Sequence, residues 1–536
     1  MTFSLKQANT LIVDDFQGMR TMLRDFVRLM GITQISTASN GKDAISQLAS
    51  SRFDVVICDH NLGPGANGQQ VLEEAKLRNL VGVSTIWVMV TAEKTTDMVM
   101  GAAEVKPDDY LLKPINQVLL QNRLEKLIAR KQSLGVVEAA IKAKDFGAAV
   151  GHCDQLLKDK TVSPQEILRI KSDLLLTMGD YAAARAVFES VLAVRNIAWA
   201  KTGLGKVLYF TQDPAGAAAL FEQVLRDNPM YVEAADWLAK AFEAMGELGR
   251  AEQTLLEAVK LSPNSPVRQK NLGDTAFKNG SLDVAQAALE KTIRISEFST
   301  HKNPAVYASL ADVFGEKNSP QEALNVLRRS KADFRFNPQA ALQTAAAESR
   351  IYQKMGQSDK ALAALATAEQ LVEQLADKLS PELLVEVAKS QLKLGQKDKA
   401  CSLLGRVIKN NHENAALVGQ IEAVFAGENL AQLGLELVST SRQEVIDINN
   451  QGVTLARQGD FEQGVKLLRT AAQQLPRSEA VIINLTGLLI GQMSKEGYKE
   501  AVGAQALALL ERLHELNPAN KKYYAYTQVL SRLKRG

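Results

Sequence analysis

The chain has 536 residues, enough for several domains, and its apolar fraction of 46% provides ample material for buried cores. Its 63 basic and 60 acidic residues leave a net charge of +3, so the composition lacks the positive excess that is typical of proteins that bind nucleic acid or anionic membranes. Aromatic residues make up only 5% of the chain, and its abundant Ala and Leu favour a mostly helical protein.

Three features of the sequence predict a cytoplasmic location. Cys58, Cys153 and Cys401 are far apart and form no CxxC motif, so we expect reduced thiols. No apolar run reaches the roughly 18 residues of a membrane-spanning helix. The first residues, "MTFSLKQANTLIVDDF", lack the long apolar segment of a signal peptide and predict a strand instead.

The first 130 residues alternate between strand and helix patterns. Runs rich in β-branched and apolar residues predict strands, and apolar residues at helical spacing predict helices. Five alternating pairs of this kind predict a doubly wound α/β domain with a five-stranded parallel sheet. The strands are expected over 10–15, 35–38, 53–59, 84–92 and 109–114, and the helices over 19–31, 41–51, 68–77, 96–104 and 118–131.

Charged and polar residues follow the predicted strands. Asp14 and Asp15 end the first strand, Asp59 ends the third, and Thr91 and Lys113 follow the fourth and fifth. The carboxyl ends of parallel strands share one edge of the sheet, where ligands bind in α/β folds. Three carboxylates at one edge repel each other unless a cation joins them, and Mg²⁺ prefers such oxygen ligands. We therefore predict a Mg²⁺ site here, with Lys113 as a further positive charge.

Four blocks of sequence, "LIVDDFQGMR", "VVICDHNL", "VMVTAE" and "YLLKP", resemble the receiver domain of two-component response regulators, in particular the chemotaxis type. The resemblance covers about residues 8–130. It implies that Asp59 accepts a phosphoryl group from the phosphohistidine of a sensor histidine kinase or of a phosphotransfer protein. It also implies a Mg²⁺ site, oriented by Asp14 and formed by Asp14, Asp15, Asp59 and the backbone carbonyl of Asn61.

The same resemblance implies roles for further positions. Thr91 and Lys113 would bind the phosphoryl oxygens, and Tyr110 would be the aromatic switch residue. Asn61 and Glu93 lie two residues beyond the acceptor and beyond Thr91, where the family tunes dephosphorylation. This pair is similar to that of fast-cycling receivers, which predicts a short-lived signal. The added charge would bias a two-state element, the inward movement of Thr91 and Tyr110.

The sequence departs from the family pattern in two places. The family usually has Pro four and Gly eight residues after the acceptor, whereas Pro64 and Gly68 are one position further on, so the loop carries one extra residue. The small residues that usually precede the fifth strand are replaced by "VKPDD" (105–109). His60, beside the acceptor, is either a catalytic base or an ordinary loop residue, and we favour the latter because it has no placed partner.

From about residue 133 the pattern changes to paired helices separated by short turns. The first turns recur at 144, 179, 212, 246 and 280, a spacing of about 34 residues. This period resembles a tetratricopeptide array, an all-α superhelix, here with roughly eleven helix pairs. Later turns of the same kind are "KNS" (317), "GQS" (356), "GQK" (395), "GEN" (427), "GDF" (459) and "EGY" (496).

Residues at the inner positions of the pairs agree with this resemblance. Small residues such as Gly205 and Ala239 would let the two helices of a repeat approach, and large ones such as Phe221 would fill the groove between repeats. The segment 425–440 is degenerate, so we expect the array to be irregular or split there. The predicted domains are a receiver over 1–130, a short connector over 131–136 and the array over 137–536.

Arrays of this kind bind peptides or helices of partner proteins along a concave face. The sequence of the predicted array contains no catalytic triad, phosphate-binding loop or metal cluster, and its scattered histidines are expected to be surface or packing residues. We therefore expect no enzymatic activity beyond phosphoryl transfer to the receiver and autodephosphorylation. Candidate contact residues on the first helices are Lys201, Lys206, Asn271 and Asn484.

The leading hypothesis is a phosphorylation-switched interaction protein of a phosphorelay. Phosphorylation would change partner binding by the array, or would pair receivers as a homodimer, through the short connector. The alternative is a transcription regulator that binds DNA directly or through a partner. However, residues 1–130 hold 14 basic and 14 acidic residues, and such a balance of charge attracts the DNA phosphates only weakly. The sequence favours neither of two further alternatives, an enzyme hidden in the repeats and a scaffold that is never phosphorylated.

Overall fold

The computed structural model describes residues 5–82, 85–92, 107–159, 163–375, 378–412, 414–517 and 520–535. The chain divides into two compact units. The first comprises residues 1–176 and 180–306, and the second comprises residues 177–179 and 307–536. The parallel sheet and the first helix pairs therefore belong to one unit, and the later helix pairs belong to the other.

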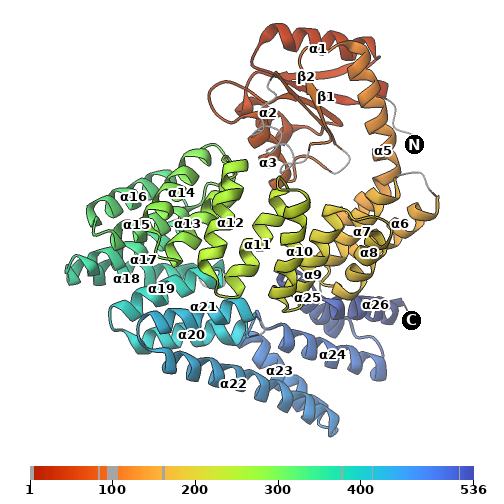
Figure 1. The fold of residues 1–536 in the computed structure, drawn as a ribbon. Coiled ribbons are helices and arrows are strands. Elements are labelled where there is room, and N and C mark those ends of the chain that lie inside the picture. Colours follow the sequence, from red (N-terminus) through yellow and green to blue (C-terminus); the bar gives the residue numbers. More distant parts are fainter. Residues whose placement is uncertain are drawn as a thin grey trace. The chain divides into compact units, whose positions relative to one another are not determined.

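Five parallel strands form the sheet of the first unit, as predicted (Figure 1). The strand order is β2-β1-β3-β4-β5, and Cys58 of β3 pairs with Val13 on one side and Met89 on the other. Because β1 and β3 are direct neighbours, the residues that follow them meet at one edge. The strands are β1 Asn9–Val13, β2 Gln34–Ala38, β3 Val55–Asp59, β4 Ile86–Thr91 and β5 Asp109–Leu112.

Helices cover both faces of this sheet. Apolar residues of α1 and α5, such as Leu23 and Leu124, pack on one face, and those of α2 and α3, such as Leu48 and Leu72, pack on the other. This arrangement confirms the doubly wound fold; the helix expected over 96–104 lies outside the described residues. The helices are α1 Gln17–Leu29, α2 Gly41–Ser50, α3 Gly68–Leu77 and α5 Gln117–Lys142, and a short 3-10 helix, Leu5–Gln7, precedes β1.

The central strand β3 leads directly to the candidate site. Val55 and Ile57 belong to the apolar cluster on one face of the sheet, and Val56 and Cys58 belong to the cluster on the other. All four side chains are fully buried. A strand buried on both faces is apolar throughout, so the polar Asp59 occurs only where β3 reaches the edge of the sheet.

The last helix of the sheet domain is longer than the sequence pattern predicts. The helix expected over 118–131 continues to Lys142, so residues 131–136 are helical and connect the sheet to the first repeat without a break (Figure 1). Gly135 disfavours a helix by about 1 kcal/mol. Its neighbours Leu134 and Val137 are buried in a cluster with residues of α6 and α7, and this burial outweighs the cost. The domain boundaries themselves stay a prediction.

The helices that follow α5 pack in consecutive pairs. The end of α5 packs on α6, α9 packs on α10, α11 on α12 and α13 on α14. They are α6 Phe146–Asp159, α7 Pro164–Thr177, α8 Tyr181–Val194, α9 Ala198–Phe210, α10 Pro214–Asp227, α11 Val232–Ala244, α12 Leu248–Leu261, α13 Pro266–Lys278 and α14 Leu282–Ile295.

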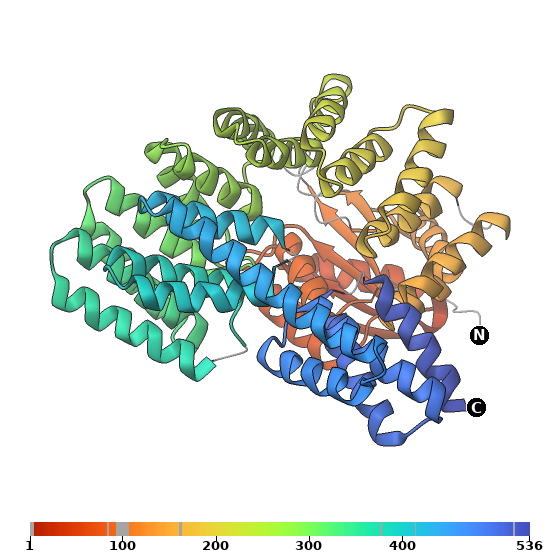
Figure 2. The ribbon, with the colours of Figure 1, turned by 90° about the horizontal axis from the view of Figure 1, so that it is seen from below.

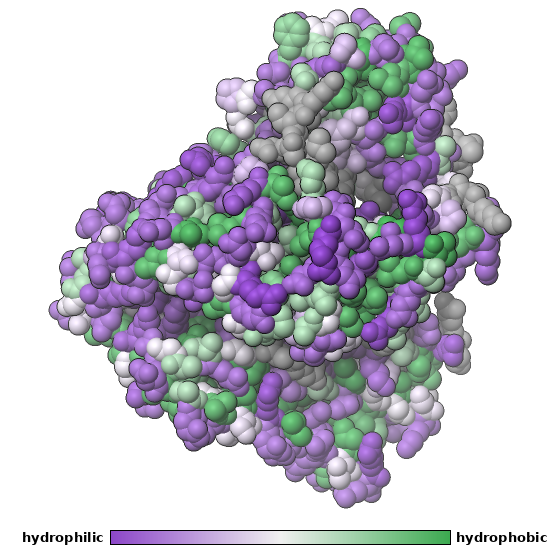
Figure 3. Space-filling model, viewed as in Figure 1, coloured by the Kyte–Doolittle hydropathy of each residue, from purple (hydrophilic) through white to green (hydrophobic). Residues whose placement is uncertain are grey.

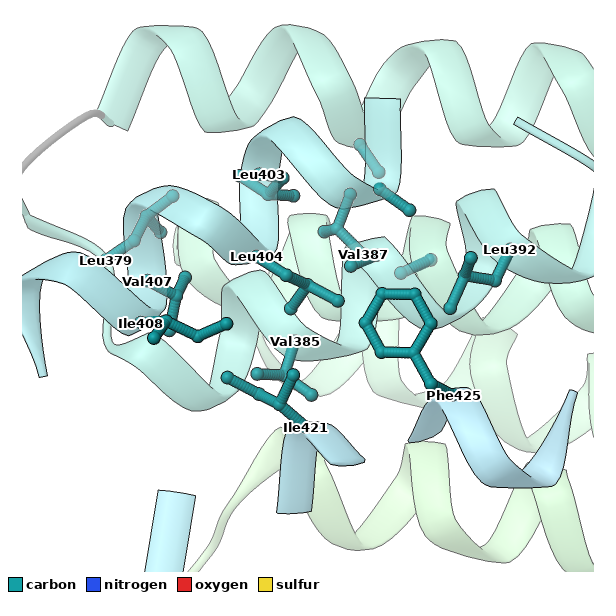
Figure 4. Close-up of a cluster of buried hydrophobic side chains, with 14 of the residues drawn as sticks. Leu379, Val385, Val387, Leu392, Leu403, Leu404, Val407, Ile408, Ile421 and Phe425 are labelled. Carbon is teal, nitrogen blue, oxygen red and sulfur yellow. The ribbon is translucent and has the colours of Figure 1, made fainter. Parts of the chain in front are cut away.

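Helix pairs continue through the second unit (Figure 2). Val387 of α19, Leu404 of α20 and Phe425 of α21 point toward one another in its largest apolar cluster (Figure 4). The helices are α15 Pro304–Glu316, α16 Pro320–Asp333, α17 Pro338–Lys354, α18 Ser358–Leu375, α19 Pro381–Lys393, α20 Lys397–Asn410, α21 Ala415–Gly427, α22 Ala431–Arg457, α23 Phe461–Gln474, α24 Glu479–Glu496, α25 Glu500–Leu516 and α26 Lys521–Arg535.

Each turn expected from the repeat pattern contains a residue with positive φ. This conformation ends the first helix of a pair and lets the chain reverse into the second. Glycine adopts it without strain, but four turns use another residue. The glycines are Gly179, Gly246, Gly280, Gly356, Gly395, Gly459 and Gly497, and the other residues are Lys144, Gln212, Asn318 and Asn429.

The segment that the sequence marks as irregular contains a fused helix. α21 ends at Gly427, and α22 then runs for 27 residues, whereas α20 and α23 have 14 each. α22 packs on both α21 and α23. It therefore serves as the second helix of one pair and the first helix of the next, which explains the degenerate pattern at 425–440.

The surface and the cysteines agree with the composition. No described helix combines the length and the apolar character that a membrane span requires. Hydrophilic residues prevail on the face shown in Figure 3, and apolar residues form small separate groups there. Cys58 and Cys153 are buried free thiols, and Cys401 is a half-buried one.

Candidate functional site

Three carboxylates gather at the carboxyl edge of the sheet, as predicted. Asp14 and Asp15 directly follow β1, and Asp59 is the last residue of β3. One oxygen of each side chain lies within 4.8 Å of the other two. Asp14 and Asp59 are buried, whereas Asp15 is exposed. Such a cluster requires positive charge close by.

The backbone around Asp14 fixes the direction of its side chain. Oδ1 of Asp14 accepts a hydrogen bond of 2.8 Å from the N–H of Phe16. The Arg20 guanidinium donates to the carbonyl oxygens of Asp14 and Asp15, at 2.6 and 3.0 Å. One carboxylate oxygen of Asp14 therefore holds the turn into α1, and Oδ2 remains available to the site.

Lys113 connects two of the carboxylates. Its N–H donates to the carbonyl of Thr91 at 2.7 Å, which continues the pairing of β4 and β5 by one residue. Its Nζ donates to Oδ2 of Asp59 at 2.8 Å and to Oδ2 of Asp14 at 3.1 Å. The ammonium group is thus held between the ends of three strands.

The two partners affect each other's pKa. Burial raises the pKa of Asp59 above its ordinary value, and the hydrogen bond and charge of Lys113 oppose the shift only in part. Burial also disfavours the charge on Lys113, but its hydrogen bonds to Asp59 and Asp14 and the charges of these carboxylates outweigh it and raise the pKa of Lys113. Lys113 therefore keeps a positive charge within hydrogen-bond distance of Asp59.

The loop after Asp59 closes tightly on the strand end. The N–H of His60 donates to Val90 O at 2.8 Å, and His60 O accepts the N–H of Gly68 at 2.9 Å. A Cβ at Gly68 would lie 2.1 Å from the carbonyl oxygen of Asp59, so only glycine fits there. The loop is therefore fixed at both ends.

Glycine and asparagine accommodate the longer loop between these ends. Gly63 and Gly65 adopt positive φ, 72° and 110°. Asn61 Oδ1 accepts the N–H of Gly63 at 3.2 Å, and Asn67 forms a capping box with Gln70 at the start of α3. The extra residue thus lies in a loop that ends at a well-capped helix.

A cavity opens between the strand ends. Thr91, the last residue of β4, is buried beside it. Asp14 lies next to this lining through its bond with Lys113. The lining brings together most of the predicted site residues: Asp15, Asp59, His60, Asn61, Thr91, Ala92 and Lys113.

Tyr110 and Glu93 are the remaining predicted site residues. Tyr110 in β5 packs against the apolar cluster of α2 and α3. Its hydroxyl is buried and has no hydrogen-bond partner among the described residues, and burial raises its pKa to about 12. The phenol is therefore in an inward orientation. Glu93 lies outside the described residues, so its role with Asn61 stays a prediction.

The donor set fits Mg²⁺. Asp14, Asp15 and Asp59 offer hard carboxylate oxygens at one point, which suits a small divalent cation better than a softer metal. Thiol or imidazole ligands are not part of this cluster. The residues that could hold the ion are therefore these three carboxylates, and the carbonyl of Asn61 as a further ligand stays a prediction.

Comparison with known proteins agrees with this geometry. Residues 10–125 match the response regulator receiver domain, and residues 202–266 and 382–411 match tetratricopeptide repeats. The chemotaxis protein CheY of Pseudomonas aeruginosa is 32% identical over 120 residues, 22% of this chain and 95% of that protein. CheY-3 of Vibrio cholerae is 30% identical over 125 residues, 23% and 95% of the two chains. The chain belongs to the response regulator receiver family, and tetratricopeptide repeats follow its receiver domain.

Solved structures that match parts of this chain include CheY4 of Vibrio cholerae and the MamA protein. The first is 26% identical, covers 23% of this chain and 98% of its own, and gives a TM-score of 0.21. The second is 20% identical, covers 34% of this chain and 96% of its own, and gives a TM-score of 0.30.

The sequence gives little indication of some residues that support the site. Arg20 lies in a quoted block, but its bonds to two carbonyl groups depend on where α1 begins. Asp108, in the unusual "VKPDD" segment, accepts the N–H of Trp87 at 2.7 Å. Neither contact follows a spacing that a pattern could reveal, because each joins a side chain to the backbone of another element.

Proposed function

We propose that this chain is a response regulator of a phosphorelay in which phosphorylation of Asp59 switches the protein interactions of the tetratricopeptide array. The donor would be the phosphohistidine of a sensor histidine kinase or of a phosphotransfer protein. The observation that carries the proposal is the contact of Lys113 with both Asp59 and Asp14, in a cavity that Asp15 and Thr91 also line.

Asp59 is the nucleophile in this proposal. Its carboxylate oxygen attacks the phosphorus atom, the P–N bond to histidine breaks, and the imidazole nitrogen keeps the electron pair and takes up a proton. Lys113 offsets the repulsion between the carboxylate and the phosphoryl oxygens. The N–H of Asn61 hydrogen-bonds to Asp59 and orients it, and Thr91 would bond a phosphoryl oxygen.

Asp14, Asp15, Asp59 and the carbonyl of Asn61 would hold Mg²⁺, which neutralises negative charge during phosphoryl transfer. Asp14 is already oriented for this by its bond to Phe16 N–H. Asn61 and Glu93 would set how long the phosphoryl group stays on Asp59, and a short lifetime is part of the proposal.

Contacts around the start of β5 support a connection from the receiver to the first repeat. Asp108 pairs with Lys131 of α5 at 3.1 Å and accepts the N–H of Trp87 at the start of β4. Arg130 of α5 hydrogen-bonds to Glu166 of α7. We call Asp108, Arg130, Lys131 and Glu166, with the nearby Glu138, the junction network. It joins the two strands that carry Thr91 and Tyr110 to the first repeats.

A second contact begins at the loop after Asp59. Gln70 accepts the N–H of Asn67 in the capping box, and its Nε2 donates to the carbonyl of Ile295, the last residue of α14, at 3.1 Å. Glu73, on the same face of α3, lies 3.9 Å from Nε2 of His301. A change in the loop would therefore reach the array directly. Pairing of receivers as a homodimer is the other output to be tested.

The test follows phosphorylation and partner binding in the full chain. Acetyl phosphate with Mg²⁺ should produce a retarded band on a phosphate-affinity gel, and both EDTA and Asp59→Asn should abolish it. Asp25→Asn, an exposed position on α1, is the matched control and should retain the band. A retarded band in Asp59→Asn would disprove the acceptor assignment.

The switch itself requires a second measurement. Proteins from the cell extract that bind the chain, and its mass by light scattering, should differ with and without beryllofluoride, and Asp59→Asn should show no difference. Identical partners and identical mass in both states would leave the receiver without an output. A gel shift with genomic fragments tests the alternative of a transcription regulator.

A further inference from the structure

Four aromatic residues gather on three successive repeats of the first unit. Tyr181 of α8 stacks on Phe210 of α9, with ring centroids 5.5 Å apart. Phe210 and Tyr209 make edge contacts with Trp237 of α11, at 5.5 and 5.6 Å. The chain has only 3 Trp and 10 Tyr, so one Trp and two Tyr at one place form an unusual concentration. We call these four residues the aromatic patch.

The aromatic patch packs on the apolar core but stays partly exposed. Phe210 is 40% exposed, and the other three rings are half-buried. Phe188 and Phe221, which fill the core between the same helices, are 1% and 0% exposed. Rigid, partly exposed rings of this kind are common where a protein binds a partner, because they offer a large contact area at little cost in conformational entropy.

Two lysines flank the indole of Trp237. The Nζ atoms of Lys240 and Lys206 lie 4.3 and 5.2 Å from its ring centroid, within the range of a cation–π interaction. Lys206 also pairs with Glu233 at 2.6 Å. Lys240 is exposed and forms no ion pair with any described carboxylate. Its charge is therefore available to a ligand.

The acidic residues around the aromatic patch already have partners. Asp236 receives two hydrogen bonds of 2.8 Å from Arg268. Glu243 accepts the hydroxyl of Thr275 and lies 3.7 Å from Lys278. The charge that remains at the aromatic patch is thus the positive charge of Lys240, which favours a negatively charged ligand.

We propose that the aromatic patch docks an acidic peptide segment of a partner protein. An apolar or aromatic side chain of the segment packs on Phe210 and Trp237, and a neighbouring carboxylate pairs with Lys240. The proposal rests on the proposed function, because it names the class of partner that the array binds.

A single-stranded nucleic acid is the less suitable ligand for the aromatic patch. It could stack bases on the rings, but its backbone needs a groove of several cations. Here α11, the helix of Lys240, also carries Glu233, Asp236 and Glu243. Lys240 is a single cation without a carboxylate partner among the described residues. An acidic peptide can place one carboxylate at Lys240 and keep its other groups away from these acids, so the observations favour the peptide.

The test measures peptide binding by the full chain with fluorescence anisotropy. The probes are two pools of short fluorescein-labelled peptides with a central Trp or Phe, flanked by Asp and Glu in one pool and by Lys and Arg in the other. The acidic pool should bind, and added salt should weaken the binding. Equal binding of the two pools, or tighter binding of oligo(dT), would overturn the proposal.

Two variants locate the binding. Lys240→Glu changes an exposed side chain, so it should fold normally and weaken binding of the acidic pool about tenfold or more, by reversing one charge pair. Lys260→Glu, at another exposed lysine, on α12, makes the same charge change away from the aromatic patch and should bind as the wild type does. Phe210→Ser should also weaken binding, by removing the exposed ring. Wild-type affinity in both Lys240→Glu and Phe210→Ser would disprove the site.

Measuring both peptide binding and phosphorylation of Asp59 separates this proposal from the proposed function. Loss of binding in the variants of the aromatic patch, with normal phosphorylation of Asp59, supports the site. If beryllofluoride has no effect on the affinity of the wild type for the acidic pool, phosphorylation does not control this site, although the site itself remains. Unchanged affinity in the variants of the aromatic patch removes the site and leaves phosphorylation of Asp59 untouched.

Discussion

Gly68 determines how closely the loop can approach the end of β3, where Asp59 lies. A side chain there would meet the carbonyl oxygen of Asp59 at 2.1 Å and Sγ of Cys58 at 3.1 Å. Backbone atoms cannot move aside as the end of a flexible side chain can, so any substitution must shift the end of β3 or the start of α3. Since Asp59 is the last residue of β3, such a shift also changes its position relative to Lys113.

We expect Gly68→Ala to lower the free energy of unfolding by about 1–3 kcal/mol and to slow phosphorylation by acetyl phosphate. Urea denaturation and the phosphate-affinity gel measure the two effects. Gly135→Ala is the control, because its Cβ would meet nothing within 4 Å in the middle of α5. That change should stabilise the protein by about 0.5–1 kcal/mol without affecting phosphorylation. Wild-type behaviour of Gly68→Ala would show that the loop can move freely.

Glu138 is a buried acid in the junction network. Its side chain is 8% exposed, and neither carboxylate oxygen has a hydrogen-bond partner among the described residues. Burial raises the pKa of Glu138 from the ordinary 4.5 to about 7, and the charge of Lys131 opposes this only in part. Between these two values the folded state holds a proton that the unfolded state has lost. Stability therefore falls as the pH rises through this range.

We expect Glu138→Gln to remove this part of the pH dependence. At about pH 5 the variant and the wild type should be similarly stable, and at about pH 8 the variant should be more stable by about 1–2 kcal/mol. Urea denaturation at the two pH values tests this, with Glu125→Gln, an exposed position on α5, as the control. A difference between variant and wild type that is the same at both pH values would contradict the assignment.

At the scale of elements, α5 is the part of the chain that belongs to both halves of the first unit. Its first residues pack on the sheet, and its last residues pack with α6 and α7. Lys131, near the middle of α5, forms an ion pair with Asp108, which directly precedes β5. It also donates a hydrogen bond to the carbonyl of Thr85, which directly precedes β4. A movement of these strands can therefore be passed to the repeats without a flexible connector.

We expect Asp108→Asn to be phosphorylated normally but to lose the effect of phosphorylation on α7. The amide can still accept the N–H of Trp87, but it no longer pairs with Lys131. Hydrogen exchange of α7 peptides with and without beryllofluoride measures the effect. Asp109→Asn is the control, because its partner Arg123, at 3.5 Å, lies within the receiver. An α7 response as large as that of the wild type would mean that the signal takes another route, such as the contact of Gln70.

Most of the receiver could be predicted from the sequence, because its strands are apolar runs that end in polar residues. Asp59 and Lys113 meet where the rule for parallel sheets places them. The length of α5 could not be predicted, since "KQSLG" is a weak local helix former that becomes helical through burial of Leu134 against later helices. The aromatic patch could not be predicted either, because its four residues come from three helices with no shared spacing; only the flanking Lys206 is among the candidate contact residues that the sequence suggests.

At the scale of the whole molecule, each compact unit has apolar clusters of its own, and the second also contains a buried ion pair. Arg350 of α17 is 2% exposed, and its Nη2 lies 2.8 Å from Asp312 of α15 and 3.2 Å from Glu386 of α19. Burial acts to raise the pKa of Asp312, but the charge of Arg350 outweighs it and lowers that pKa. One guanidinium therefore joins the first helices of three successive pairs.

Removing this guanidinium tests whether the two units unfold separately. Arg350→Met leaves Asp312 and Glu386 without their common partner, so we expect a loss of about 3–5 kcal/mol in the second unit alone. A chain of two units need not unfold in one step, and calorimetry should resolve two transitions, of which only one moves down. Mg²⁺ with beryllofluoride should bind the receiver and therefore raise only the other transition.

Lys354→Met provides the comparison on the same helix. Lys354 pairs with Glu316 at 2.6 Å, but both side chains are much more exposed, so its loss should cost no more than about 1 kcal/mol. If Arg350→Met lowered both calorimetric transitions by the same amount, the units would unfold as one body. A signal from Asp59 could then reach α15 to α26 through the stability of the whole chain. Separate transitions would instead confine its direct effect to the first unit, where the aromatic patch lies.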